Sequence, residues 1–168
     1  GWGKYLRCTE LPFKNEKRKS KIPIYIVQGN LNDNRRNMKL LIKILEEEYD
    51  KDFKIRIIGK GELPICLREY RDKIEFHRNL DFINFHKKFL DCYCILPLTL
   101  KNTQPEYYIS KLTSTINYSL AYNLKTLIDK NLQEIYKLKN VEIFEDENDI
   151  VQKFKNTLED FYKSHIIP

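Results

Sequence analysis

The chain has 168 residues, of which 42% are hydrophobic and 12% aromatic, and 30 Lys and Arg against 24 Asp and Glu leave a formal charge of +6. This composition is typical of one globular domain and excludes fibrous and linker proteins. No run of about 18 apolar residues and no charged-then-apolar leader is present. We therefore expect no transmembrane segment and no secretory signal.

Much of the charge excess lies near the N-terminus, where residues 14–21 carry five cations and one anion. Short charge runs of this kind are usually solvated chain. We therefore interpret residues 1–22 as a basic linker or N-terminal extension and residues 23–168 as the domain. We expect no nucleic-acid partner.

The four cysteines are Cys8, Cys66, Cys92 and Cys94, and they form no C-x-x-C pair and have no histidine pair at zinc spacing. Cys92 and Cys94 lie two positions apart in an apolar run, which predicts two reduced core thiols on one face of a strand. Reduced thiols indicate a reducing compartment, so the expected location is cytoplasmic.

From residue 23 onward, β-rich apolar runs alternate with amphipathic stretches. The predicted strands lie at 23–29, 53–58, 74–77, 92–96, 125–129 and 141–144. The predicted helices lie at 38–49, 63–70, 82–89, 111–124, 132–138 and 149–165. This alternation predicts an α/β fold, a Rossmann-like doubly wound parallel sheet of about six strands in a single domain.

Details within these segments give further expectations. Asp81 is predicted to cap the helix that carries Phe82, Phe85 and Phe89. The helix starting near residue 111 should bury a stripe formed by Ile116, Leu120 and Leu124. We expect residues 46–48 and 145–149, which are acidic, to be solvated. Residues 98–108 hold few large apolar side chains and are predicted to form a functional loop that is mobile without ligand.

Ligands of open parallel sheets bind beyond the carboxyl ends of the strands. Here that edge gathers glycines, basic side chains and hydroxyls near helix starts, which suit an anionic ligand such as a diphosphate. No acidic metal cluster is evident, so we expect a metal-independent site. The candidate binding residues are Gly29, Asn30, Arg35, Arg36, Lys60, Asn79, Leu80, Lys111, Thr113, Ser114 and Thr115. No catalytic residue is assigned, and no histidine is given a catalytic role.

Three segments carry a resemblance to a known family: Val27-Gln28-Gly29-Asn30-Leu31 followed by Arg35-Arg36-Asn37, Ile57-Ile58-Gly59-Lys60-Gly61, and Phe89 to Pro97. Over residues 23–164 the chain resembles the C-terminal nucleotide-sugar-binding domain of GT-B glycosyltransferases, in a divergent, family 4-like form. The resemblance implies that the nucleotide base packs near Asn79 and Leu80. It also implies that Arg35 and Arg36 hold the diphosphate and that residues 111–115 bind phosphate and sugar.

The resemblance implies a donor-binding half that transfers a sugar, of the hexosyl type, from a nucleoside-diphosphate sugar to an unknown acceptor. The donor is the substrate, and no cofactor is expected. The acceptor domain would precede this one and is missing from the chain, so the isolated domain should show no meaningful transfer. Many members place two glutamates eight positions apart where this chain has Ser110 and Tyr118. Two alternatives remain: a non-catalytic Rossmann-like module that binds a nucleotide or a protein, and a phosphate-binding enzyme such as an epimerase.

Overall fold

The computed structural model describes residue 13 and residues 16–29, 36–109 and 114–164. Its centre is a six-stranded parallel sheet in the order β3-β2-β1-β4-β5-β6. The strands are β1 (Ile24–Gln28), β2 (Lys54–Gly59), β3 (Ile74–Arg78), β4 (Cys94–Ile95), β5 (Lys125–Asp129) and β6 (Val141–Phe144). The predicted α/β Rossmann-like class is confirmed.

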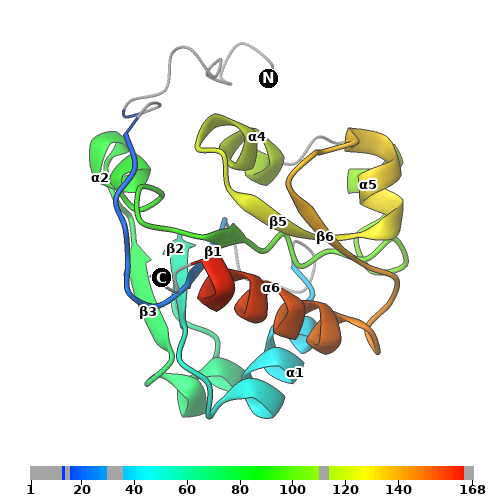
Figure 1. Cartoon of the computed structure of the whole chain (residues 1–168), viewed down its shortest axis with the longest axis horizontal. Coiled ribbons are helices and arrows are strands. Elements are labelled where there is room, and N and C mark those ends of the chain that lie inside the picture. The colour runs from blue at the N-terminus through cyan, green and yellow to red at the C-terminus, as the bar shows by residue number, and fades with distance from the viewer. Residues whose placement is uncertain (1–12, 14–15, 30–35, 110–113, 165–168) are drawn as a thin grey trace.

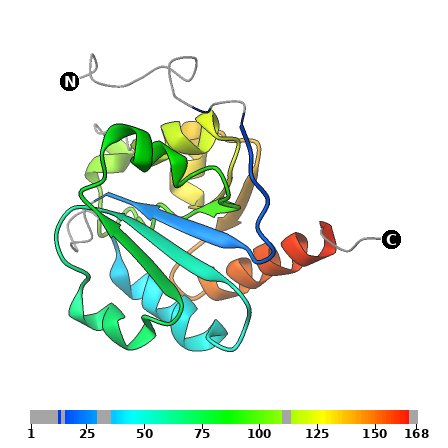
Figure 2. The same cartoon turned by 90° about the vertical axis from the view of Figure 1, so that its left-hand side faces the viewer.

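Helices connect the strands and cover both faces of the sheet (Figure 1). The α-helices are α1 (Met38–Glu48), α2 (Phe82–Lys87), α3 (Glu106–Ile109), α4 (Ser114–Ala121), α5 (Lys130–Tyr136) and α6 (Ile150–Ser164), and a 3-10 helix, η3, spans Ile65–Tyr70. α1 and α6 lie on one face, whereas α2, α4 and α5 lie on the other (Figure 1). β1, β2 and β3 run side by side at one end of the sheet (Figure 2).

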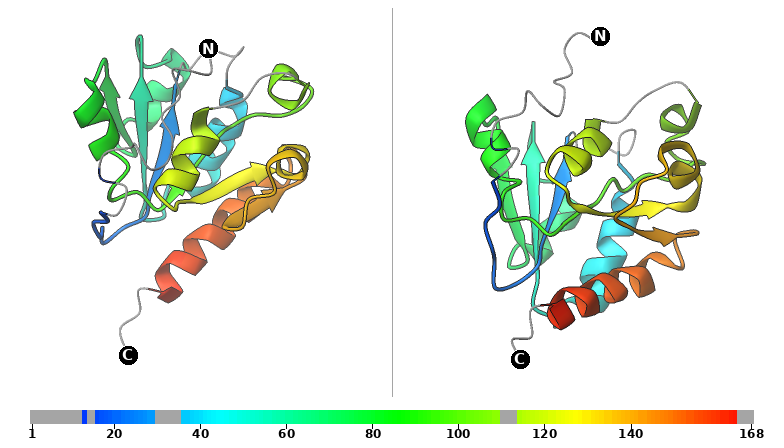
Figure 3. Two further views of the ribbon diagram at one scale, coloured as in Figure 1. Left: turned by 90° about the horizontal axis from the view of Figure 1, so that it is seen from above. Right: turned by 45° about the horizontal axis from the view of Figure 1, so that its top comes forward.

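The core divides between the two faces because neighbouring residues of each strand point in opposite directions. Tyr25 and Val27 join α1 and α6 in one cluster, while Ile26 packs with residues near α2 and α4 in another. α6 crosses its face of the sheet (Figure 3) and is held there by Thr157. The Thr157 hydroxyl lies 2.7 Å from the Tyr25 hydroxyl, and the Thr157 carbonyl accepts a 2.7 Å bond from Tyr93.

Several sequence expectations hold at the level of single residues. Asp81 caps α2, because its carboxylate accepts a 2.8 Å hydrogen bond from the Asn84 amide. β5 and β6 have the predicted bounds. Met38, Leu41 and Leu45 are buried along α1, whereas Tyr49, which continues the same apolar spacing, is 39% exposed.

The two strand cysteines do not share a face, which corrects the sequence prediction. β4 contains only Cys94 and Ile95, so Cys92 precedes the strand and its alternation. Cys94 packs in the α1–α6 cluster and Cys92 against the α2–α4 cluster. Both are free thiols, and burial raises the pKa of Cys92 to about 12. A thiol with such a pKa is a packing residue rather than a nucleophile.

Two expectations about burial are wrong. Leu120 is 56% exposed, because α4 is short and turns only the side of Ile116 and Ala121 toward the core. Glu48 was expected in solvent but is only 2% exposed, because the last turn of α1 packs against α6.

Candidate functional site

The strand order reverses between β1 and β4, which marks the topological switch point of the sheet. The chain leaves β1 toward β2 on one side and later places β4 on the other. The two connections therefore diverge and leave a crevice beyond the carboxyl ends of these strands, where ligands of open α/β sheets bind. The described residues around this crevice come from the end of β1, the start of α1, residues 96–104 and the start of α4.

A small polar network joins β1 to α4 at the switch point. Arg36 donates through Nη2 to the Gln28 carbonyl at 2.7 Å and to the Thr115 hydroxyl at 3.2 Å. The Thr115 hydroxyl in turn donates to Gln28 Oε1 at 3.1 Å. Arg36 is 4% exposed and Thr115 is fully buried. The network therefore fixes the N-terminus of α4 beside the end of β1.

Two glycines are required here because other chain atoms lie very close. A Cβ atom on Gly29 would lie 2.9 Å from Arg36 Nη2, and φ at Gly29 is +110°. A Cβ on Gly59 would lie 2.1 Å from the Gly29 carbonyl oxygen. A side chain at Gly59 would push the ends of β1 and β2 apart, and one at Gly29 would displace the Arg36 guanidinium. The glycines thus permit the close backbone packing on which the edge is built.

Backbone strain also gathers at this edge. Leu98, three residues after the end of β4, has a φ of +54° and is buried. Asn79, directly after β3, has the same φ of +54° and is exposed. Left-handed backbone is costly for leucine in particular, and such residues persist where the surrounding structure holds them. The Leu98 carbonyl accepts a 2.7 Å bond from the Asn37 amide, which ties the residue to the start of α1.

Polar side chains anchor the connection after β4. Gln104 is fully buried, and its side-chain oxygen accepts a 3.0 Å bond from the Leu100 amide. Asn37, which caps α1, donates through Nδ2 to the Thr103 hydroxyl at 3.3 Å. Residues 106–109 form α3, which was not predicted. Polar side chains here replace the apolar anchors whose scarcity suggested a mobile loop.

A cavity of about 810 Å³ opens at the carboxyl edge on the α1 side. Its walls are the start of α1, residues 100–104, Asp129, Asn131 and residues 145–148. Burial raises the pKa of Asp129, although Oδ1 accepts bonds from the Tyr108 hydroxyl at 2.7 Å and from the Leu132 amide at 2.9 Å. Amide and carboxylate groups dominate this lining, so the cavity suits a ligand rich in hydroxyl groups.

Only some of the predicted site residues lie together at the switch point. Gly29, Arg36 and Thr115 come together at the switch point. Lys60 and Asn79 are exposed beyond β2 and β3, and Leu80 packs partly into the α2–α4 cluster. The remaining candidates lie outside the described residues or, for Ser114, have no described side chain: Asn30, Arg35, Lys111, Thr113 and Ser114.

The large cavity is lined by other residues than those predicted, including Asn37, Gln104 and Asp129. Gln104 could have been found from the sequence, because it lies in the long connection after the fourth strand. Asp129 offered a weaker signal as an acid between a strand and a helix. Its role as the cap of α5 explains that position without any ligand.

Two features are absent from the described residues. In that part of the chain, no helix is long and apolar enough to cross a membrane. Over the same ranges, no group of three His, Cys, Asp or Glu side chains could hold a metal ion.

Comparisons with known proteins extend the argument at the level of the fold. No protein-family model matches the chain, and no curated protein matches its sequence. Among solved structures, a mutant O-GlcNAc transferase of Thermobaculum terrenum matches with a TM-score of 0.63 over 95% of this chain at 13% identity. A putative UDP-N-acetylglucosamine 2-epimerase of Listeria monocytogenes matches with a TM-score of 0.48 over 84% of this chain and 37% of its own, at 12% identity.

The chain therefore shares its fold with a GT-B glycosyltransferase. The chain covers 33% of the length of that transferase.

Proposed function

We propose that this chain is the donor-binding domain of a glycosyltransferase and holds a nucleoside-diphosphate sugar at the carboxyl edge of the sheet. The observation that carries this proposal is the switch point between β1 and β4, where Arg36 and Thr115 fix the start of α4 beside Gly29. A helix N-terminus beside a close glycine turn offers backbone N–H groups and a partial positive charge to an anion.

Arg36 is proposed to act mainly as a positioning residue. Its guanidinium is buried behind Gly29 and donates to Gln28 and Thr115, so it does not lie open on the helix surface. Its charge still adds positive potential to the crevice, since burial reduces screening by water. Direct phosphate contacts are assigned to the α4 start and, outside the described residues, to Arg35, Lys111 and Thr113.

The remaining parts of the proposal rest on the family resemblance. The base would pack against Asn79 and Leu80, with Lys60 near the ribose or phosphate. The transferred group would be a hexose, and the transferase family would be family 4-like. The acceptor would bind a second domain outside this chain, and positioning by arginine, lysine and helix N-termini would make a metal unnecessary. Without the acceptor domain, the isolated chain would show no meaningful transfer.

The test is a calorimetric titration of the chain with UDP, GDP and ADP sugars in the presence of a chelator. One nucleotide sugar is expected to bind, and Thr115→Ala is expected to weaken it by about tenfold, as for a lost charge-assisted bond and a shifted helix start. Ser119→Ala, at the far end of the same helix, is the matched control and should leave the affinity unchanged. Binding that disappears with the chelator, or equal losses in both variants, would contradict the proposal.

A second function is favoured by one observation. Tyr118, which stands where many family members have a ribose-binding glutamate, packs its ring 5.3 Å from Phe85 and 5.1 Å from Phe89. An aromatic side chain turned into such a cluster supplies no carboxylate to a donor. This favours a nucleotide-binding module without turnover. In that case free nucleoside diphosphate would bind as tightly as any of its sugars, whereas a donor domain would bind the correct sugar more tightly.

A further inference from the structure

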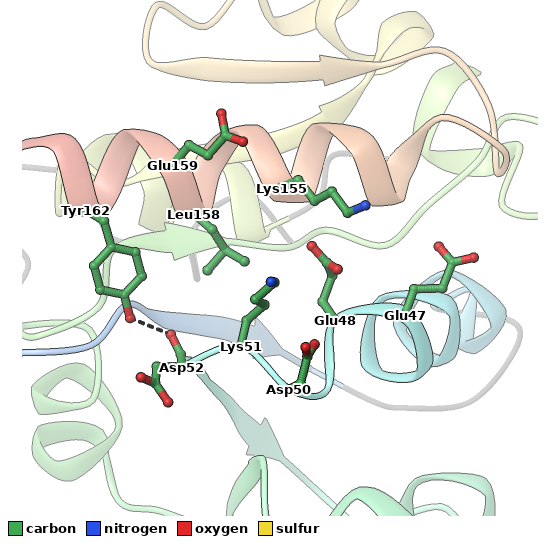
Figure 4. A pocket seen from close by; sticks show the side chains of 9 residues that line it. All are labelled: Glu47, Glu48, Asp50, Lys51, Asp52, Lys155, Leu158, Glu159 and Tyr162. Atoms are coloured by element: carbon green, nitrogen blue, oxygen red, sulfur yellow. Dashed lines mark hydrogen bonds between the residues drawn. The ribbon is translucent and has the colours of Figure 1, made fainter.

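A second cavity opens at the opposite edge of the sheet, between the end of α1, the turn into β2, and α6 (Figure 4). Its volume is about 690 Å³, within the usual range of small-molecule clefts. Five carboxylates and two lysines line it, together with Leu158 and Tyr162. Tyr162 closes one end, because its hydroxyl donates a 2.7 Å bond to the Asp52 carbonyl. The site is remote from the switch point and does not depend on the function proposed there.

Glu48 is the unusual residue of this cavity. It is 98% buried, since its exposed fraction is 2%, and its Oε1 atom has no hydrogen-bond partner. Its carboxylate points from α1 toward the space beneath α6 (Figure 4). A buried carboxylate oxygen without a donor costs free energy that a structural residue would normally avoid. The group is therefore arranged as if to receive a donor from outside the chain.

The local sequence also opposes a negative charge at this position. Glu48 is the last residue of α1 and follows Glu46 and Glu47, and the last turn of the helix holds no basic residue. A helix C-terminus carries partial negative charge and disfavours carboxylates. Burial raises the pKa of Glu48, while Lys155 and Lys51 act in the opposite direction. Residues that break several local rules at once are typical of functional sites.

The lining indicates the chemistry of the ligand. The carboxylates are spread between the α1–β2 turn and Glu159 on α6, and no three of them in the described residues are close enough to hold a metal ion. A single compact cation would thus meet only part of the negative charge. An extended chain with several ammonium groups could meet separate carboxylates, and its methylene groups could lie against Leu158 and Tyr162.

We propose that this cavity binds a linear polyamine, with one ammonium group donating to the Glu48 carboxylate and another reaching Glu159. Ammonium groups supply the hydrogen-bond donor that Glu48 Oε1 lacks and add positive charge to a lining of five carboxylates and two lysines. Lys155 and Lys51 border the same space and compete with the ligand, so they set a limit to its affinity.

The test is a calorimetric titration of the full chain with spermidine at low ionic strength. Glu48→Gln, which keeps the shape of the side chain, should weaken binding by at least about tenfold, the effect of losing a charged hydrogen bond. Glu46→Gln is the matched control: it changes the net charge equally on the same helix but does not line the cavity, and should change affinity less than about twofold. Butylamine, with one ammonium group, should bind at least about tenfold more weakly than spermidine.

The melting curve of Glu48→Gln will show whether this variant folds. If it does not, a second variant still tests the proposal. Lys155→Gln removes a competing cation and should strengthen spermidine binding severalfold. The proposal is overturned if millimolar spermidine gives no binding heat, or if both glutamine variants at 46 and 48 lose affinity equally. It is also overturned if butylamine matches spermidine, or if Lys155→Gln leaves the affinity unchanged.

Discussion

Two buried charges, Arg56 and Glu48, lie on opposite faces of the sheet and have very different surroundings. Arg56 on β2 points toward α2, where its Nε donates to Glu75 at 2.5 Å and its Nη1 to Asp91 at 2.5 Å and to the Lys88 carbonyl at 2.8 Å. Glu48 on α1 has an oxygen with no hydrogen-bond partner. Both side chains are buried, but only Arg56 has charged hydrogen-bond partners within the chain.

The pKa shifts follow this difference. Burial alone would lower the pKa of Arg56, yet its hydrogen bonds to Asp91 and Glu75 hold that pKa above its ordinary value. Burial raises the pKa of Glu48, and the nearby lysines only partly oppose it. The paired charge of Arg56 belongs to the structure, because it joins β2, β3 and the end of α2. An unpaired one is a candidate for binding.

The largest expected effect comes from breaking the paired charge. Arg56→Met should lower the free energy of unfolding by about 2–4 kcal/mol, because Glu75 and Asp91 would lose their shared partner and repel each other. Glu75 and Asp91 are partly exposed, so water screens part of this repulsion. Denaturant unfolding measures the change.

The control for this variant is Arg78→Met on the neighbouring strand. Arg78 pairs with Glu62 in an exposed position, so its loss should cost less than about 0.5 kcal/mol. Equal losses in the two variants would show that the Arg56 network has no special role.

A third buried charge, Arg36, is hydrogen-bonded to neutral groups, whereas Arg56 is paired with carboxylates and Glu48 has an unpaired oxygen. Replacing Arg36 tests whether it holds the switch point together. Arg36→Ala should lower the free energy of unfolding by about 1–3 kcal/mol, because it breaks the bonds to Gln28 and Thr115 and leaves a cavity beside Gly29. Nucleotide affinity should fall in the same variant. An unchanged melting temperature would mean that these bonds contribute nothing to stability.

Local patterns predicted most of the fold, since strand and helix periodicities depend on neighbouring residues. The α/β class, the cap at Asp81 and the bounds of β5 are examples. Burial of charged residues was not predictable in the same way. Arg36 and Glu48 occupy the ordinary polar ends of helices in the sequence, and only α4 and α6, distant in the chain, make them buried. Long-range packing of this kind leaves no local signal.

Gln104 shows the same limit in the connection after β4. A scarcity of apolar residues predicted mobility, whereas a buried amide side chain holds the segment. Gln104→Ala should cost about 1–2 kcal/mol, because the Leu100 amide would lose its acceptor. Hydrogen exchange should become faster at residues 98–104 and remain unchanged in β5. If exchange is already fast in the natural sequence, the original expectation of a mobile loop is restored.

The smallest expected effect, and the only stabilising one, comes from removing the unpaired charge. Glu48→Gln should raise the free energy of unfolding by about 1 kcal/mol at pH 7, because glutamine buries no ionised group. In the natural chain burial raises the pKa of Glu48 above its ordinary value of 4.5, so the neutral form is favoured by folding. The contribution of this group to stability therefore grows as pH falls through its folded pKa and levels off below about 4.5.

The pH dependence separates this explanation from a general charge effect. The stability difference between Glu48→Gln and the natural chain should be largest at neutral pH and should shrink as the solution is acidified, because the natural glutamate then becomes neutral as well. Glu46→Gln, on an exposed turn of the same helix, should differ little from the natural chain across this range. Saturating spermidine should reduce the advantage of Glu48→Gln, since the ligand stabilises only the folded chain that binds it. A pH-independent difference would mean that Glu48 is paired in solution, and Arg56 and Glu48 would then no longer differ in kind.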